Sequence, residues 1–408
     1  MSYINTYRTK NNTNSRSRKW NNSRPTRSRS KSRRIGQYID PSRFIKIATA
    51  SNEKPYEPKH TFSDFLISDK LKSNLAAKRY ITPSHIQDQA IPIGLSGKDV
   101  IGIASTGTGK TAAFAIPIIQ NLTTDSSSSA IIVAPTRELA QQIEEEFREL
   151  SRGCGLYSTL LIGGASMGRQ LSELRRNPRI IIGTPGRIMD HLKRRALRLD
   201  KFNLVVLDEV DRMLDMGFVQ DVSDILKQTS QQRQIFFFSA TMDTRVRKLI
   251  ENFSTNPTTI SVKAGLASEN VHQDVIKFQH NNEKLDKLHD ILINKDVSKA
   301  IIFDETQRDV EHLAVELVSR GFSTEALHGG KSQGQRRRAL SMFKSNQVNI
   351  LVATDVAARG IDVADITHVI NFSIPKVYDD YIHRIGRTGR AGRVGYALTF
   401  VENRSNSY

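Results

Sequence analysis

The sequence has a single cysteine in 408 residues, Cys154, which excludes an internal disulfide and a metal site built from cysteines. It has no run of about 18 apolar residues, the length that a membrane-spanning helix needs. The N-terminus lacks the apolar core of a secretory signal. These absences predict a soluble cytoplasmic protein that is not associated with a membrane.

Acidic residues are missing from the first 34 positions, which hold eleven Lys and Arg and therefore carry +11. The whole chain carries +18, so the remaining residues add only +7. A basic excess of this kind favours a polyanionic partner, nucleic acid above all. The opening segment is rich in Asn, Ser and Arg and almost free of aliphatic residues, so we predict a disordered basic tail over residues 1–59. Tethering of RNA, a tail without a specific role and an organelle transit peptide are its three interpretations.

Short aliphatic runs recur from about residue 60 onward, and amphipathic helical patterns separate most of them. Strands that alternate with helices predict a parallel sheet covered on both faces. A polar stretch interrupts this pattern, and the same alternation then returns. The sequence therefore predicts an α/β fold with two parallel-sheet domains, at 60–262 and 273–408, joined by a short linker at 263–272.

The segment IASTGTGKT follows one of these aliphatic runs and precedes a helical pattern. Its glycines let several backbone N–H groups converge on a phosphate. Lys110 is expected to reach the outer phosphates, and the Thr111 hydroxyl is expected to bind Mg²⁺. Ala104 replaces the first glycine of the usual pattern, and a chance Gly/Thr turn is the alternative that the strand and helix context argues against. The residues predicted to contact the nucleotide here are Ser105, Thr106, Gly107, Thr108, Gly109, Lys110 and Thr111.

The segment VVLDEVDRML ends an apolar run and then places three carboxylates within four residues. Asp208 is expected to hold Mg²⁺ through water, and Glu209 is expected to orient and activate the attacking water. Carboxylates this close need a nearby cation, which the Mg²⁺ ion and Lys110 would supply. A solvated acidic turn is the alternative, and the phosphate loop upstream argues against it.

The segment YIHRIGRTGR, residues 381–390, offers cations that would neutralise the charge of a phosphoryl-transfer transition state. Arg387 and Arg390 are three residues apart and separated by a glycine, so we predict that both reach the nucleotide as arginine fingers. An Arg/Gly run alone more often indicates a basic patch, but the phosphate loop and the acidic motif favour the catalytic interpretation.

These motifs, in this order over about residues 60–400, resemble those of the DEAD-box RNA helicases, a superfamily 2 family with two RecA-like domains. The resemblance implies an ATP-dependent RNA helicase, an RNA-dependent ATPase that hydrolyses ATP to ADP and phosphate between the domains. Such an enzyme unwinds short RNA duplexes or remodels RNA–protein complexes. The implied cofactors are ATP and Mg²⁺, and the implied partner is RNA held by its backbone without sequence specificity. The segments LDMGF and HGGKSQGQ favour the bacterial RhlE-like branch.

The resemblance also implies roles for individual positions. In the segment before ITPSHIQDQAIP, Tyr80 would stack on adenine, and Gln87 would hydrogen-bond its edge. Asp362 would lie near the ribose, and His383 would help to position the attacking water. The SAT segment, through Ser239 and Thr241, would couple hydrolysis to unwinding. The residues expected to face the RNA sugar–phosphate backbone are Arg137, Gly164, Thr184, Arg187, Gln333, Arg336 and Thr354.

Three features depart from the family pattern. Val210 stands where the family has alanine, but it keeps both carboxylates, so we expect hydrolysis to survive. Arg79 stands where glycine commonly precedes the aromatic residue, which weakens the adenine assignment. The chain stops at Tyr408, soon after a final strand, and this predicts that the outer face of the second domain is incompletely covered.

Two further functions compete with the helicase interpretation. An ATP-gated RNA clamp or assembly factor would bind RNA with little unwinding. A DNA-directed motor is the other alternative, and the SHIQDQAIP element argues against it.

Overall fold

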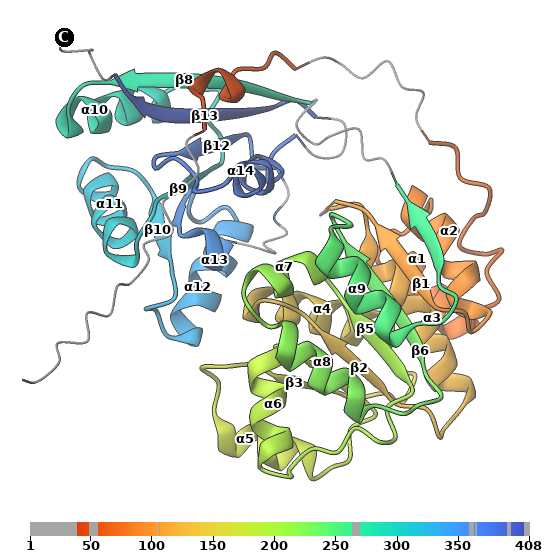
Figure 1. The fold of residues 1–408 in the computed structure, drawn as a ribbon. Helices are drawn as coiled ribbons and strands as arrows, with labels where there is room; N and C mark the ends of the chain where they lie inside the picture. The colour runs from red at the N-terminus through yellow and green to blue at the C-terminus, as the bar shows by residue number, and fades with distance from the viewer. Residues whose placement is uncertain are drawn as a thin grey trace, which may run out of the picture. The chain divides into compact units, whose positions relative to one another are not determined.

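The computed structural model describes two parallel sheets, each with helices on both faces, which confirms the predicted fold class (Figure 1). The first sheet with its helices is called the first domain, and the second sheet with its helices the second domain. None of the described helices is long and apolar enough to cross a membrane. The described residues are 39–48, 56–105, 107–262, 270–358, 363, 365–389 and 393–403.

Seven parallel strands form the first sheet, in the order β3-β4-β2-β5-β6-β1-β7. Three of them, β2, β4 and β5, are four-residue runs rich in Ile, Val and Leu that are buried throughout, as expected for a sheet covered on both sides. Their bounds are β1 Val100–Ile103, β2 Ala130–Val133, β3 Ser158–Leu161, β4 Ile180–Gly183, β5 Leu204–Leu207, β6 Gln234–Ser239 and β7 Thr258–Ser261.

The helices of the first domain bury one apolar cluster on each face of the sheet. Several begin at a side-chain cap, such as Thr136, whose hydroxyl accepts the Leu139 N–H at the start of α4. One face carries α1 Asp69–Ala77, α2 His85–Leu95, α3 Lys110–Thr124 and α4 Arg137–Leu150. The other carries α5 Met167–Leu174, α6 Pro185–Lys193, α7 Val210–Asp215, α8 Val219–Gln228 and α9 Thr244–Phe253.

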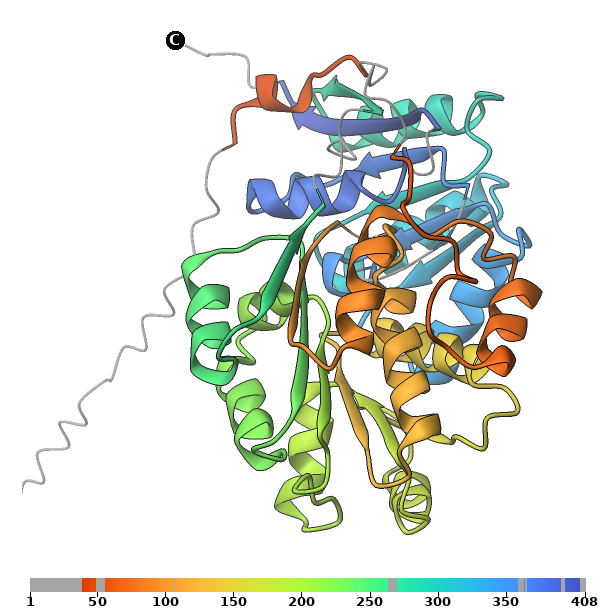
Figure 2. The same cartoon turned by 90° about the vertical axis from the view of Figure 1, so that its right-hand side faces the viewer.

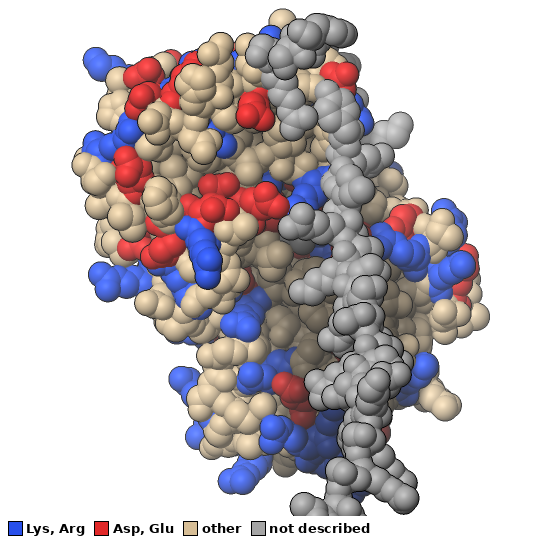
Figure 3. All heavy atoms as spheres, turned by 60° about the vertical axis from the view of Figure 1, so that its left-hand side comes forward, with Lys and Arg blue, Asp and Glu red and all other residues tan. Residues whose placement is uncertain are grey.

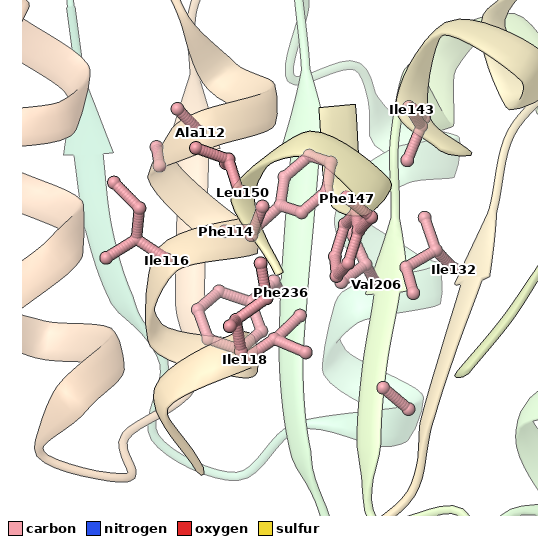
Figure 4. Close-up of a cluster of buried hydrophobic side chains, with 14 of the residues drawn as sticks. Ala112, Phe114, Ile116, Ile118, Ile132, Ile143, Phe147, Leu150, Val206 and Phe236 are labelled. Carbon is pink, nitrogen blue, oxygen red and sulfur yellow. The ribbon is translucent and has the colours of Figure 1, made fainter. Parts of the chain in front are cut away.

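The aromatic centre of the first cluster joins α3 and α4 to the sheet (Figure 4). Phe114 lies between Phe147 and Phe238, with ring centroids 6.1 and 5.4 Å apart. All three side chains are fully buried. Because α3 begins at the phosphate loop, this packing fixes the helix that presents the loop to a ligand.

Six parallel strands form the second sheet, in the order β10-β11-β9-β12-β13-β8. Their bounds are β8 Val271–Phe278, β9 Ala300–Phe303, β10 Thr324–Leu327, β11 Ile350–Ala353, β12 His368–Asn371 and β13 Gly395–Glu402. Its helices are α10 Asn281–Leu292, α11 Gln307–Ser319, α12 Gln333–Lys344, α13 Asp355–Ala358 and α14 Tyr378–Ile385.

Residues 39–48 differ from the predicted disordered tail of residues 1–59. They contain the 3-10 helix η1, Pro41–Phe44, which lies beside β8 and β13 in two views (Figures 1 and 2). Ile39 and Phe44 are buried against the second domain, so this short stretch has the apolar residues that the preceding segment lacks. Residues 1–38 and 49–55 of the predicted tail, and 263–269 of the predicted linker, lie outside the described residues.

Replacement of Phe147 by Ala should destabilise the first domain by about 3–5 kcal/mol, because it empties a fully buried aromatic site. Tyr157→Ala is the control, since Tyr157 is 80% exposed. Thermal unfolding followed by near-UV circular dichroism measures both. Equal midpoints for the two variants would contradict the central packing role of Phe147.

Candidate active site

The order of the first sheet brings three loops together. Strands β5, β6 and β1 are neighbours and parallel, so the loops that follow them leave the same edge. In the loop after β1, Gly107 and Gly109 have φ angles of 83° and 91°, a region that strongly favours glycine. A Cβ atom on Gly109 would also lie 2.4 Å from Nε2 of Gln87. The phosphate loop therefore needs glycine both for its curl and for its contact with α2.

Lys110 is the first residue of α3, and its side chain folds back into the loop. It is 6% exposed, and its Nζ donates to the Ala104 carbonyl at 3.0 Å. Thr111 follows on the same first turn. Backbone N–H groups at a helix N-terminus together with a lysine form a place where phosphate binds well.

The two carboxylates of Asp208 and Glu209 follow β5 and are buried, at 2% and 6% exposure. Burial raises the pKa of Asp208 to about 6; Lys110 lowers this pKa, and the neighbouring carboxylates raise it. Glu209 has a φ of 51°, and its N–H donates to Asp208 Oδ1 at 3.0 Å. The chain thus holds two buried acids beside one lysine, an arrangement that a bound cation would stabilise.

The carboxylate of Asp211, the third acid of this motif, is hydrogen-bonded to the segment that follows β6. Its Oδ2 accepts hydrogen bonds from the N–H groups of Ala240 and Thr241, at 3.1 and 2.9 Å, and from the Thr241 hydroxyl. The Asp211 N–H donates in turn to Ser239 Oγ at 3.3 Å. The predicted coupling segment is therefore bonded directly to the helix that follows Asp208 and Glu209.

A cavity of 750 Å³ is lined by the phosphate loop and these acids. The first domain contributes Tyr80, Gly107, Gly109, Lys110, Thr111, Asp208 and Glu209 to its lining. The second domain contributes Asp365, Thr388, Gly389 and Arg387, among others. The cavity is large enough for a nucleotide, and basic and acidic groups from both domains line it.

Helix α14 and the turn after it carry two arginines with different surroundings. Arg384 is 3% exposed and forms a bidentate pair with Asp355, at 2.6 and 2.8 Å. It also donates to Asn371 Oδ1 and to the Ser373 carbonyl. Arg387 lines the cavity instead, and its Nε donates to the His383 carbonyl at 3.3 Å. Arg384 therefore holds the helix in place, while Arg387 lines the cavity.

A second group of predicted residues gathers away from the phosphate loop. The Arg137 guanidinium lies against Gly163 and Gly164; a Cβ on Gly164, whose φ is 76°, would lie 2.4 Å from Arg137 Nη1. Burial lowers the pKa of Arg137, and the nearby Arg336 and Arg187 lower it as well. Three cations thus lie close to one another, which favours a polyanion between them.

Two contacts link this group across the domains. Arg336 pairs with Glu138 at 2.7 Å, with side chains 7% and 1% exposed. Gln333 Nε2 donates to Gln141 Oε1 at 3.2 Å. Several buried polar atoms here have no hydrogen-bond partner in the described part of the chain: Glu138 Oε1, Gln141 Nε2, Arg187 Nε, Gln333 Oε1 and Arg336 Nε. Of these, Arg187 Nε lies 3.6 Å from Asp190 Oδ2, in an ion pair.

The other predicted site residues occupy a range of positions. The Tyr80 hydroxyl donates to Glu146 at 2.8 Å, and Gln87 Nε2 donates to the Gly109 carbonyl at 3.1 Å, so Gln87 supports the phosphate loop. The Ser105 carbonyl accepts a hydrogen bond from the Thr108 hydroxyl. Thr184 precedes α6, and Thr354 follows β11. Thr106, Asp362 and Arg390 lie outside the described residues.

Comparison with known families and proteins now adds to this geometry. A model of the DEAD/DEAH box helicases matches residues 84–249, and one of the helicase conserved C-terminal domain matches residues 283–392. The DEAD-box ATP-dependent RNA helicase CshA of Bacillus licheniformis is 44% identical over 346 residues, which are 84% of this chain and 71% of that protein. This chain belongs to the DEAD-box ATP-dependent RNA helicases. A CshA from Listeria monocytogenes is 43% identical over 85% of this chain and 67% of its own length.

Solved structures agree with this assignment of the helicase. Saccharomyces cerevisiae Dbp5 bound to RNA and ADP BeF3 matches with a TM-score of 0.75 at 30% identity, over 84% of this chain and 90% of that one. Mss116p bound to ssRNA and AMP-PNP matches with a TM-score of 0.77 at 30% identity, over 86% of this chain and 76% of that one. The relatives named CshA belong to a branch other than the RhlE-like one, so that finer prediction is not confirmed.

Three features of the helicase site were missed from the sequence. The link from Asp211 to the coupling segment joins residues 30 apart. The buried role of Arg384 was hidden inside a motif that also holds Arg387. Arg212, 4% exposed, pairs with Asp380 of α14 at 3.1 Å. The sequence shows only that an acid or an arginine stands in a charged motif, and this does not identify the residue with which its side chain pairs.

Replacement of Arg384 by Lys should destabilise the second domain by about 2 kcal/mol, because lysine cannot keep the bidentate pair with Asp355 and the two further bonds. Thermal unfolding of the helicase measures this loss, with the exposed Arg338→Lys as control. At temperatures where the variant is folded, its ATP turnover should stay within a few-fold of the parent enzyme. A complete loss of turnover in folded protein would instead place Arg384 in the chemistry.

Proposed function

We propose that this helicase hydrolyses Mg²⁺–ATP in the cavity between β1, β5 and α14, and that residues of both domains act on one γ-phosphate. One observation supports this most strongly: Lys110, Asp208 and Glu209 line the same cavity as Arg387. A nucleotide bound there touches both sheets, so its binding energy depends on their arrangement.

Backbone N–H groups of the phosphate loop and Lys110 would hold the phosphates, and Glu209 would orient the attacking water by accepting its hydrogen bond. Arg387, with Arg390, would stabilise the charge that develops on the transferred phosphoryl group. His383 would help to position the attacking water. Tyr80 lines the cavity and would stack on the adenine. Asp362 would lie at the ribose.

Magnesium fits the donors that the chain offers. Thr111 and Asp208 present one hydroxyl and one buried carboxylate, and phosphate oxygens and water would complete an oxygen shell. Among the described residues, no group of three or more His, Cys, Asp or Glu side chains is arranged to hold a metal, which agrees with a metal that arrives with the nucleotide. When bound, the ion would neutralise charge on the phosphate oxygens.

RNA would bind beside Arg137 and Arg187, where the buried polar atoms without a hydrogen-bond partner lie. Phosphate and ribose oxygens would accept from Arg187 Nε and Arg336 Nε, and a 2′-hydroxyl would donate to Glu138 Oε1. Thr184, Gly164 and Thr354 would add contacts to the backbone. None of these groups reads a base edge, so we infer binding without sequence specificity.

The surface charge supports specific contacts over a general basic surface. On the face drawn in Figure 3, Lys and Arg side chains are spread widely, and several Asp and Glu side chains lie next to one another in its upper half. The residues after position 34 carry only +7. We therefore assign the RNA affinity of the folded domains to the Arg137 group.

Glu209→Gln should keep ATP affinity and lose RNA-stimulated turnover by at least about a hundredfold, because glutamine fills the same space but cannot accept the water proton. Turnover with and without single-stranded RNA and fluorescent-nucleotide binding measure the two properties. If the parent protein bound ATP but did not hydrolyse it, an ATP-gated clamp would be favoured over a helicase. Strong turnover without strand separation would do so as well.

Gly164→Ala should weaken RNA binding about tenfold, a change of about 1.4 kcal/mol, because the new Cβ displaces the Arg137 guanidinium. Gly155→Ala is a matched control, since Gly155 also has a positive φ, of 70°, but no described atom lies within 4 Å of the position that its Cβ would occupy. Fluorescence anisotropy at several salt concentrations measures the affinities. Equal losses in both variants would show that backbone strain alone is responsible.

A further inference from the structure

Residues 39–48 fold onto the second domain although they precede the first domain in sequence. Asp40 caps η1 by accepting the Ser42 N–H at 2.9 Å, and Pro41 occupies its first position. This turn directs Phe44 inward, where it is fully buried, while Ile45 and Ile47 on either side of Lys46 are 58% and 75% exposed. The alternation of buried and exposed residues shows a strand-like segment docked by one face.

The surface that receives Phe44 is built from α14, β8 and β13. The Phe44 ring lies 4.7 Å from that of Tyr381, which is itself fully buried and donates to Gln273 Oε1 at 2.9 Å. The Arg43 guanidinium lies over the Tyr378 ring at 3.9 Å. Ile39 completes the cluster with Val271, Ile385 and Ala397.

Backbone pairing strengthens this contact. Lys46 and Gln273 exchange two hydrogen bonds, at 3.0 and 2.8 Å, as an antiparallel bridge. The Ala48 N–H donates to His272 Nδ1 at 3.3 Å. Strand β8 is the edge of the second sheet, so residues 46–48 cover the start of an edge that would otherwise expose unpaired backbone groups.

The chain is anchored again on the first domain only eight residues later. The Tyr56 hydroxyl donates to Asp88 at 2.5 Å, and its ring stacks on His85 at 3.9 Å, both on α2. Asp88 also accepts the N–H groups of Lys59 and His60. Eight Cα–Cα steps from Ala48 to Tyr56 span at most roughly 26–29 Å.

The interdomain linker has the same number of steps and neighbouring anchors. Val262, which donates to the Ile103 carbonyl, and Asn270, whose carbonyl accepts the Gly395 N–H, are also eight residues apart. Asn270 directly precedes β8, where Lys46 is bound. Val262 follows β7, which contacts α2. The two domains are therefore joined by two short connections with adjacent anchors.

We propose that residues 39–48 are a docking strap: an internal peptide ligand of the second domain that attaches the two domains to one another at a second place, beside the linker. A single attachment leaves the domains free to take many relative orientations, whereas a second attachment with neighbouring anchors reduces their number. Fewer orientations in the open protein lower the entropy lost when ATP and RNA draw the domains together. The strap thus favours closure without touching either ligand.

The first experiment cuts the strap without removing it. Residues 49–55 are replaced by a seven-residue protease site in the full chain, so that cleavage breaks the connection and leaves the Phe44 contacts intact. Spin labels at Val219→Cys and Val315→Cys, both exposed positions, in a Cys154→Ser background report the interdomain distance distribution. Cleavage should broaden this distribution in nucleotide-free protein and leave it unchanged with RNA and ADP–beryllium fluoride. It should also raise the KM for ATP in RNA-stimulated turnover. If cleavage left the distance distribution of the nucleotide-free protein unchanged, the proposed effect of the strap on the domain arrangement would be overturned.

The second experiment tests docking itself. After cleavage, the N-terminal fragment should co-elute with the remaining chain in size-exclusion chromatography, and loss of the fragment from the cleaved parent would contradict docking. Phe44→Ala should release the fragment, whereas Ile45→Ala, a neighbouring exposed aliphatic residue, should retain it. Lys46→Pro removes the N–H that pairs with Gln273 and leaves Phe44 unchanged, and it should weaken retention even where Phe44→Ala does not fold. If Phe44→Ala and Lys46→Pro both retained the fragment, the proposed docking surface would be overturned.

Discussion

The adjacency of β1, β5 and β6 is the constraint on which the active site of this helicase depends. Parallel strands buried on both faces present their carboxyl ends at one edge, so the loops that follow them meet there. The phosphate loop, the acidic motif and the coupling segment are far apart in sequence and come together for this reason. Packing of Phe114 against Phe147 and Phe238 then fixes α3, and with it the loop from which Lys110 projects.

The same edge concentrates charge that is expensive to bury. Asp208 and Glu209 are almost inaccessible and have Lys110 as a nearby cation, and burial is why the pKa of Asp208 rises to about 6. Buried acids with incomplete compensation suit a site that receives a cation with its substrate. Asp211 avoids this cost, because backbone and hydroxyl donors of residues 240–241 satisfy its carboxylate. Of the three acids in this motif, Asp208 and Glu209 thus line the cavity, and Asp211 stabilises the fold.

Local patterns in the sequence were sufficient for much of this arrangement. The aliphatic runs gave most strands of both sheets, because a strand buried on two faces reads as an uninterrupted apolar run. They did not give the two edge strands β7 and β8, which are only partly buried. The phosphate loop and Asp208 were predicted from residue type and spacing, since their chemistry is local. The bond between Asp211 and Thr241 was not, because it depends on which strands are neighbours. The roles of Arg384 and Arg387 could not be separated either, because their partners distinguish them and their sequence context does not.

Residues 39–48 illustrate the same limit from the other side. Composition predicted disorder across residues 1–59, because an average over that range is dominated by Arg, Ser and Asn. Ile39 and Phe44, together with the backbone bridge at Lys46, dock a ten-residue stretch, since the second domain offers an aromatic surface around Tyr381 and a sheet edge at β8. A window average cannot detect such a segment, because its stability comes from a surface more than 200 residues away. Short apolar islands within a basic segment are therefore better judged by the surface they could complete than by their own composition.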